Sequence, residues 1–107
     1  MALTRDFRET IVERVQRDPD FAKALLDEAA TLFLNGEPHT ARLILRDLVN
    51  ATVGFEKLAT KTSKPAKSLH RMLSKQGNPP MDNLAAILRV LRKSLGVDMK
   101  AHTVEAA

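Results

Sequence analysis

Apolar side chains recur every three or four positions along most of this chain, whereas the alternation typical of strands is nearly absent. This period predicts three helices in the first half, over about residues 4–17, over about 20–35, and from Pro38 to near Gly54. Their apolar positions, in chain order, are Phe7, Ile11, Val12 and Val15, then Phe21, Leu25, Leu26, Ala29, Leu32 and Phe33, then Ala41, Ile44, Leu45, Leu48 and Val49. Each helix has one apolar face to bury, so the pattern favours helices packed against helices.

Residues that break or cap helices separate these three segments. Either Asp18 or Asp20 can cap the second helix, next to Pro19. Asn35-Gly36 is typical of a helix C-terminus, and Pro38 suits the first turn of the third helix.

The same spacing predicts three further helices in the second half, over about residues 55–62, 65–74 and 81–95. Residues 77–80, Gly-Asn-Pro-Pro, are expected to form a loop, because Gly77 is free to take a positive φ and the two prolines cannot join a helix interior. Gly96 should end the last helix, with a brief strand near residues 97–99.

We therefore expect an all-α fold, a compact bundle of about six helices. Residues 1–100 should form one domain, consisting of N-terminal helices over 1–53 and a second part over 54–96. Residues 101–107 are polar and are expected to form a flexible tail.

Composition excludes several classes of protein. The chain has 107 residues and no cysteine, which removes disulfides, thiolate nucleophiles and cysteine-ligated zinc. No apolar run approaches the roughly 20 residues of a membrane helix, and MALTRDFRET has charges where a secretion signal has its apolar stretch. These features predict a cytoplasmic protein with no membrane partner.

Charge divides the chain into two unlike halves. Residues 1–53 carry seven Lys and Arg against nine Asp and Glu, and residues 54–107 carry ten against four. The basic half contains one stretch, residues 57–80, with six Lys and Arg and no carboxylate. The net charge is therefore −2 for residues 1–53 and +6 for residues 54–107. This division indicates two surfaces with different partners, one of them a polyanion.

The basic stretch also has the spacing of a helix-turn-helix. Ala59 is small enough for two helices to cross closely, Ser63 can occupy the turn, and Leu69 can hold the second helix against the first. We expect Leu58, Ala59, Leu69, Met72 and Leu73 to form the shared core. Lys64, Lys67, Arg71 and Lys75 step by three, four and four residues, so they should share the opposite face, where a phosphate backbone would favour them.

Residues 55–81, FEKLATKTSKPAKSLHRMLSKQGNPPM, resemble the helix-turn-helix of XRE-type addiction-module antidote proteins, which are relatives of HigA-like antitoxins. The resemblance rests on Ser68-Leu69, Arg71, Leu73-Ser74 and Gly77-Asn78-Pro79. It extends upstream through Asp18-Pro19-Asp20-Phe21-Ala22 and Leu45-Arg46-Asp47-Leu48, and covers about residues 5–99.

This resemblance implies a lambda-repressor-like DNA-binding fold and a homodimer that represses its own operon at a palindromic operator. It also implies that the protein neutralises a RelE-like toxin. The chain departs from the family at Ser63, where Gly is usual, and at Pro65, where a Ser N-cap is usual. A proline offers no capping side chain, so we expect Ser63 or Lys64 to begin the recognition helix, with Pro65 in its first turn.

On helix-turn-helix geometry, the N-terminal part of the second helix enters the major groove of double-stranded DNA. The candidates for base contacts are Ala66, Lys67 and Arg71. The candidates for phosphate contacts are Phe55, through its backbone N–H, and Lys57, Lys61, Lys64, Ser68, His70, Ser74, Lys75 and Asn78.

The sequence contains no recognisable set of catalytic residues. The serines have no convincing His and Asp companions, no glycine-rich phosphate loop follows a strand, and the three histidines are too scattered for a metal site. We therefore expect no enzyme, no metal and no cofactor.

The N-terminal helices allow two interpretations. They can simply complete the core, or they can present carboxylates to a basic toxin or to a second copy of the chain, the candidates being Asp6, Glu9, Glu13, Asp27 and Glu28. A free-standing XRE-type regulator without a toxin, and an RNA-binding or purely structural adaptor, remain as alternatives. The RNA alternative has no exposed aromatic residue in the basic half to stack on bases.

Overall fold

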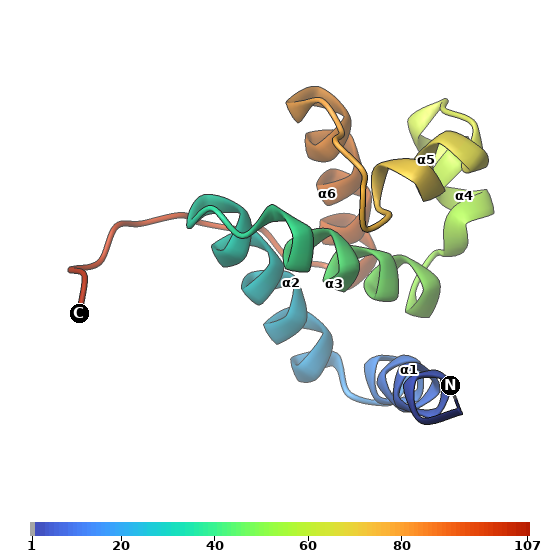
Figure 1. Ribbon diagram of the computed structural model, residues 1–107, viewed down its shortest axis with the longest axis horizontal. Coiled ribbons are helices and arrows are strands. Elements are labelled where there is room, and N and C mark those ends of the chain that lie inside the picture. The colour runs from blue at the N-terminus through green and yellow to red at the C-terminus, as the bar shows by residue number, and fades with distance from the viewer. Residues whose placement is uncertain (1) are drawn as a thin grey trace.

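The computed structural model describes the backbone of residues 2–107 and the side chains from residue 10 onward. Six helices follow one another without strands in this range: α1 (Ala2–Arg17), α2 (Pro19–Leu34), α3 (Pro38–Ala51), α4 (Gly54–Thr62), α5 (Ala66–Met72) and α6 (Met81–Leu95) (Figure 1). The expected all-α fold with six helices is confirmed. The expected strand near residues 97–99 is wrong, because that segment has no strand to pair with.

Local signals in the sequence set several helix ends. The Asp18 side chain caps α2 by accepting a hydrogen bond of 3.2 Å from the Phe21 N–H. Pro19 and Pro38 occupy first-turn positions of α2 and α3, and Gly96 ends α6 in the left-handed conformation. These boundaries depend only on residues next to each helix end, which is why the sequence could predict them.

A single hydrophobic core joins all six helices. α3 packs against α1, α2 and α4, and α4 also packs against α5 and α6. Fully buried side chains come from five of the helices, namely Leu26, Leu45, Leu48, Val49, Leu58, Leu69, Ile87 and Leu91, and Val15 of α1 completes the cluster. Phe7, which we expected on the apolar face of the first helix, lies outside the described side chains.

The segment after α6 first packs against α2 and then extends into solvent. Val97 and Met99 pack against the core beside Leu26 of α2, while Asp98 accepts a 2.7 Å hydrogen bond from Arg92. Residues 101–107 are exposed throughout and run away from the helices (Figure 1). The alternation of inward and outward side chains at 97–100 is thus produced by packing on α2 rather than by a strand.

Within the described part of the chain, no helix combines the length and the apolar character needed to cross a bilayer.

Candidate nucleic-acid interface

The turn between α4 and α5 has the conformation expected from its sequence. Ser63 lies in the left-handed region, with φ 56° and ψ 37°, and no other non-glycine residue of the described backbone has a positive φ. The N–H of Lys64 donates a 3.2 Å hydrogen bond to the carbonyl of Ala59, which closes the end of α4. Ser63 therefore occupies the turn, as expected, and it does so in the left-handed conformation.

The beginning of α5 differs from our expectation. Pro65 is extended, with φ −63° and ψ 139°, and the helix starts at Ala66, so Pro65 does not lie in the first turn. The Pro65 carbonyl accepts the N–H of Leu69 at 3.1 Å, so Pro65 serves as the N-cap residue through its backbone alone. The physical reason is that proline restrains φ but not ψ, and the ψ value here turns the chain out of the left-handed Ser63 into the helix.

α5 is also shorter than expected, because it ends at Met72 and not near Ser74. The N–H of Ser74 turns back to the carbonyl of Arg71 at 3.2 Å, which tightens the last turn. Lys67 and Arg71 therefore lie on the helix, whereas Lys64 precedes it and Lys75 follows it. The four-residue basic stripe is helical only in its middle.

The inner face of α5 packs as the apolar spacing predicted. Leu58, Leu69 and Leu73 are fully buried, and Ala59 and Met72 pack against the same core while partly exposed. The ring of His70 stacks on Phe55 of α4, with 3.8 Å between ring centroids and 18° between the planes. This contact joins α5 to α4.

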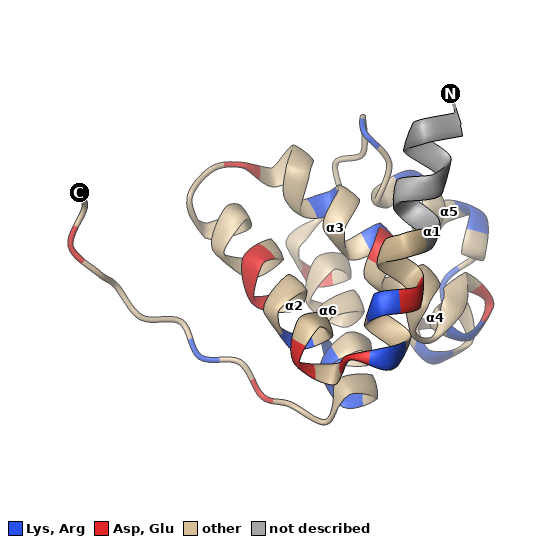
Figure 2. Cartoon of the chain, turned by 90° about the horizontal axis from the view of Figure 1, so that it is seen from below, with Lys and Arg blue, Asp and Glu red and all other residues tan. Residues whose placement is uncertain are grey.

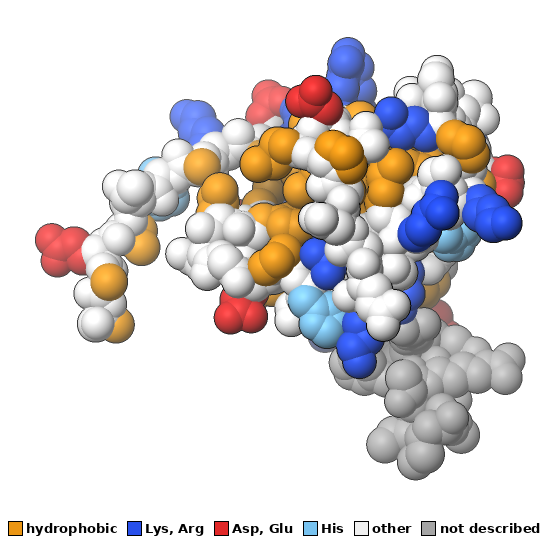
Figure 3. Space-filling model, turned by 45° about the horizontal axis from the view of Figure 1, so that its top comes forward, with side chains coloured by type: hydrophobic (Ala, Val, Ile, Leu, Met, Phe, Trp, Pro, Cys, Tyr) orange, Lys and Arg blue, Asp and Glu red, His pale blue; other side chains and the backbone are white. Residues whose placement is uncertain are grey.

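The outer face of α5 presents positive charge to solvent. Lys67, Arg71 and Lys75 are exposed, and Ala66 and Ser68 are partly exposed beside them. None of these three cations forms an ion pair with a side chain of residues 10–107. Basic side chains gather with a histidine on the α4–α5 side of the molecule (Figure 3). The charged residues of α2, by contrast, are mainly Asp and Glu (Figure 2).

Several phosphate-contact candidates already have other contacts. The Phe55 side chain is only 6% exposed, so it could offer only its backbone N–H, and the Ser74 hydroxyl donates a 2.7 Å hydrogen bond to the carbonyl of Arg71. His70 is exposed at its edge but held by the stack on Phe55. Lys64 is partly exposed and Asn78 is exposed.

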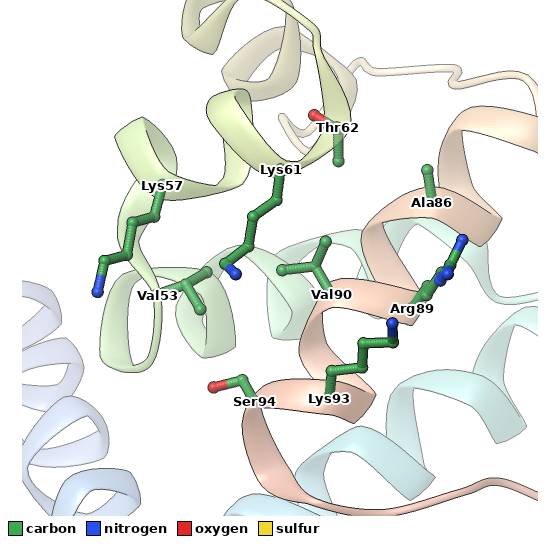
Figure 4. A pocket seen from close by; sticks show the side chains of 9 residues that line it. All are labelled: Val53, Lys57, Lys61, Thr62, Ala86, Arg89, Val90, Lys93 and Ser94. Carbon is green, nitrogen blue, oxygen red and sulfur yellow. The ribbon is translucent and has the colours of Figure 1, made fainter.

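Lys57 and Lys61 belong to a different surface from Lys67 and Arg71. Both line a cleft between α4 and α6, opposite Arg89 and Lys93, and no residue of α5 lines it (Figure 4). The structure thus separates the candidate cations into two groups, one on α5 and one beside α6.

Arg42 of α3 is an important residue that our reading of the sequence missed. Its guanidinium donates hydrogen bonds to two carbonyls beyond the end of α5, to that of Ser74 at 3.2 Å and to that of Lys75 at 3.1 Å. Carbonyl oxygens outside regular secondary structure need hydrogen-bond donors, and the guanidinium supplies two of them in one planar group. Nothing local in the sequence indicates this contact, because its partners lie more than 30 residues away.

Gly77 is free to take a positive φ but does not do so; among the glycines, that conformation occurs at Gly36, Gly54 and Gly96. A Cβ at Gly77 would lie 2.6 Å from the carbonyl oxygen of Arg71 and closer still to that of Met72. Gly77 is therefore required by the close approach of the loop to the end of α5.

The acidic candidates of the N-terminal half are only partly described. Glu13, Asp27 and Glu28 are exposed on α1 and α2, whereas the side chains of Asp6 and Glu9 lie outside the described range. Among described residues, no group of three or more His, Asp and Glu is arranged to hold a metal ion.

Comparisons of the chain with protein-family models, with curated proteins and with solved structures found no match. The function must therefore be argued from this geometry: a short, firmly packed helix whose outer face is basic and exposed.

Proposed function

We propose that the protein is a sequence-specific DNA-binding transcriptional regulator that inserts α5 into the major groove. The observation that carries the proposal is the pair Lys67 and Arg71 on the outer face of a helix whose inner face is buried through Leu69. Both are exposed and have no ion-pair partner among the side chains of residues 10–107. Rigid presentation of cations from a helix is what groove recognition requires.

The competing explanation is a basic surface that is merely solvated. A surface of that kind normally mixes both signs of charge, since an i, i+4 pair of opposite charges stabilises a helix by about 0.2–0.5 kcal/mol. Here no Asp or Glu occurs from Lys57 to Pro80. A carboxylate in this stretch would repel phosphate, so its absence favours a polyanion partner.

In this proposal the residues have distinct roles. The planar guanidinium of Arg71 can donate two hydrogen bonds to a guanine edge, and Lys67 and Ala66 approach neighbouring bases. Lys64, Lys75 and Asn78 hold phosphates, which set the position of the helix without reading sequence.

We further propose that the regulator is an antitoxin that acts in the cytoplasm as a homodimer on a palindromic operator and neutralises a RelE-like toxin. This rests on the resemblance of residues 18–22, 45–48 and 55–81 to addiction-module antidotes. The exposed carboxylates Glu13, Asp27 and Glu28 suit a basic, RNA-cleaving partner. The alternative is a free-standing regulator, and co-expression with the product of the adjacent gene distinguishes them: a toxic basic protein that co-purifies with this chain identifies an antitoxin.

The DNA proposal is tested by selecting duplexes from a random pool and measuring affinity by fluorescence anisotropy at several salt concentrations. Arg71→Ala should weaken binding to the selected duplex by about 1–3 kcal/mol and spare unrelated duplex. Lys75→Ala should weaken binding to both duplexes about equally and lower the slope of log K against log salt by about one.

Two results would contradict the proposal. One is unchanged binding of both variants to every duplex. The other is tighter binding of the wild type to single strands than to duplex, which would favour the RNA-binding alternative.

A further inference from the structure

A basic cleft lies between α4 and α6, separate from the outer face of α5. Its volume is about 570 Å³, and its floor includes Val53 and Val90. Lys57 and Lys61 border it from α4, and Arg89 and Lys93 border it from α6. Figure 4 shows Lys61 extending between the two helices, with Arg89 and Lys93 along the facing side of α6.

The four cations have no acidic counterpart. The residues that line the cleft include no Asp or Glu, and none of the four cations forms an ion pair with a side chain of residues 10–107. Four positive groups around one concave surface raise the local potential, and low-dielectric walls concentrate it.

Helix stability explains only part of this arrangement. Each helix places its two cations four residues apart, a spacing at which like charges repel. Lys57 also lies in the first turn of α4, where the helix dipole disfavours a cation. Lys61, in the last turn of α4, and Lys93, in the last turn of α6, are favoured by their own helix dipoles, whereas Lys57 and Arg89 are not.

We propose that this cleft binds a nucleoside di- or triphosphate. The four cations would hold the phosphates, and Val53 and Val90 would contact the nucleoside. The volume lies within the range of roughly 300–1,000 Å³ typical of small-molecule sites. A concave cleft lined from two helices fits a compact polyphosphate better than the convex backbone of a duplex.

Calorimetric titration of the full chain with ATP, inorganic triphosphate and adenosine tests the site directly, at about 0.15 M ionic strength. It needs no DNA, so its outcome is independent of the proposed regulator function. We expect ATP to bind more tightly than inorganic triphosphate, because only ATP reaches the apolar floor. Adenosine alone should not bind measurably, because it lacks the charged groups.

The double variant Lys61→Gln/Lys93→Gln should weaken ATP binding by about tenfold or more, since two charge-assisted contacts are lost. The matched control Lys67→Gln/Lys75→Gln removes the same charge from the α5 side and should leave ATP affinity within about twofold. Circular dichroism would check that both variants keep their helices.

Any of four results would overturn the proposal. These are no ATP binding at about 1 mM, equal weakening by the two double variants, inorganic triphosphate binding as tightly as ATP, and a cleft variant that loses duplex affinity but not ATP affinity.

Discussion

At the scale of single residues, the end of α5 depends on how closely the chain returns to it. The N–H of Gly77 donates a 3.0 Å hydrogen bond to the carbonyl of Ser74, and the position that a Cβ would occupy faces the carbonyls of Arg71 and Met72. A side chain at this position has no room that a rotamer change could provide, because the obstructing atoms are backbone.

Gly77→Ala should therefore destabilise the protein by roughly 1–3 kcal/mol, the usual cost of forcing an extra carbon into a packed site. The measurement is urea unfolding followed by circular dichroism. Asn78→Ala is the matched control, since Asn78 is exposed and should change stability by less than about 0.5 kcal/mol. Equal stability of the two variants would mean that the loop can move away from α5 at little cost.

At the scale of elements, α5 depends on its neighbours for its existence. With seven residues it is far shorter than the roughly 12–15 residues at which an isolated helix becomes even marginally stable. Leu69 anchors its inner face, the stack of His70 on Phe55 joins it to α4, and Arg42 joins the residues after it to α3. The orientation of Lys67 and Arg71 is thus set by contacts outside α5.

Arg42→Ala should lower the free energy of unfolding by about 1 kcal/mol, because two partly solvated hydrogen bonds to carbonyls are lost. It should also weaken specific DNA binding, although Arg42 is not among the proposed DNA contacts. Thermal melting and anisotropy with the selected duplex measure the two effects.

Arg46→Ala is the control for Arg42, since Arg46 lies one turn further along α3 and forms no hydrogen bond with the described residues at the end of α5. If the Arg42 and Arg46 variants melt at the same temperature and bind the duplex equally, Arg42 does not position α5.

At the scale of the whole molecule, one core serves two unlike surfaces. Buried residues form a continuous cluster from Val15 in α1 to Leu91 in α6, and α3 lies between the N-terminal helices and α4. The negative half and the positive half of the sequence are therefore parts of one packed body. The N-terminal helices therefore stabilise the position of α5, because they pack against α3, which in turn packs against α4.

A shared core predicts one cooperative unfolding transition. Scanning calorimetry should give equal calorimetric and van't Hoff enthalpies, of roughly 70 kcal/mol if unfolding occurs near 60 °C. Two separated transitions would contradict this and would indicate that residues 1–53 and 54–96 unfold independently.

The sequence predicted most of the fold because its strongest signals act over short distances. Apolar spacing located all six helices, and Gly96 marked the end of the last one. Asp18 was one of two candidates for the cap of α2, and Ser63 was expected in the turn before α5. Each of these depends on residues within about one turn, where the local chain decides the conformation. The buried face of α5 was predictable for the same reason.

Tertiary structure alone decided how the candidate surfaces are assembled. It placed Arg42 on the carbonyls of Ser74 and Lys75, packed Gly77 against the end of α5, and grouped Lys57 and Lys61 with Arg89 and Lys93. Two of these, the Arg42 contacts and the cleft, join groups about 30 residues apart, and the third depends on how the chain folds back beyond α5. Such contacts follow from the packing of whole helices, and no local pattern of residues encodes them.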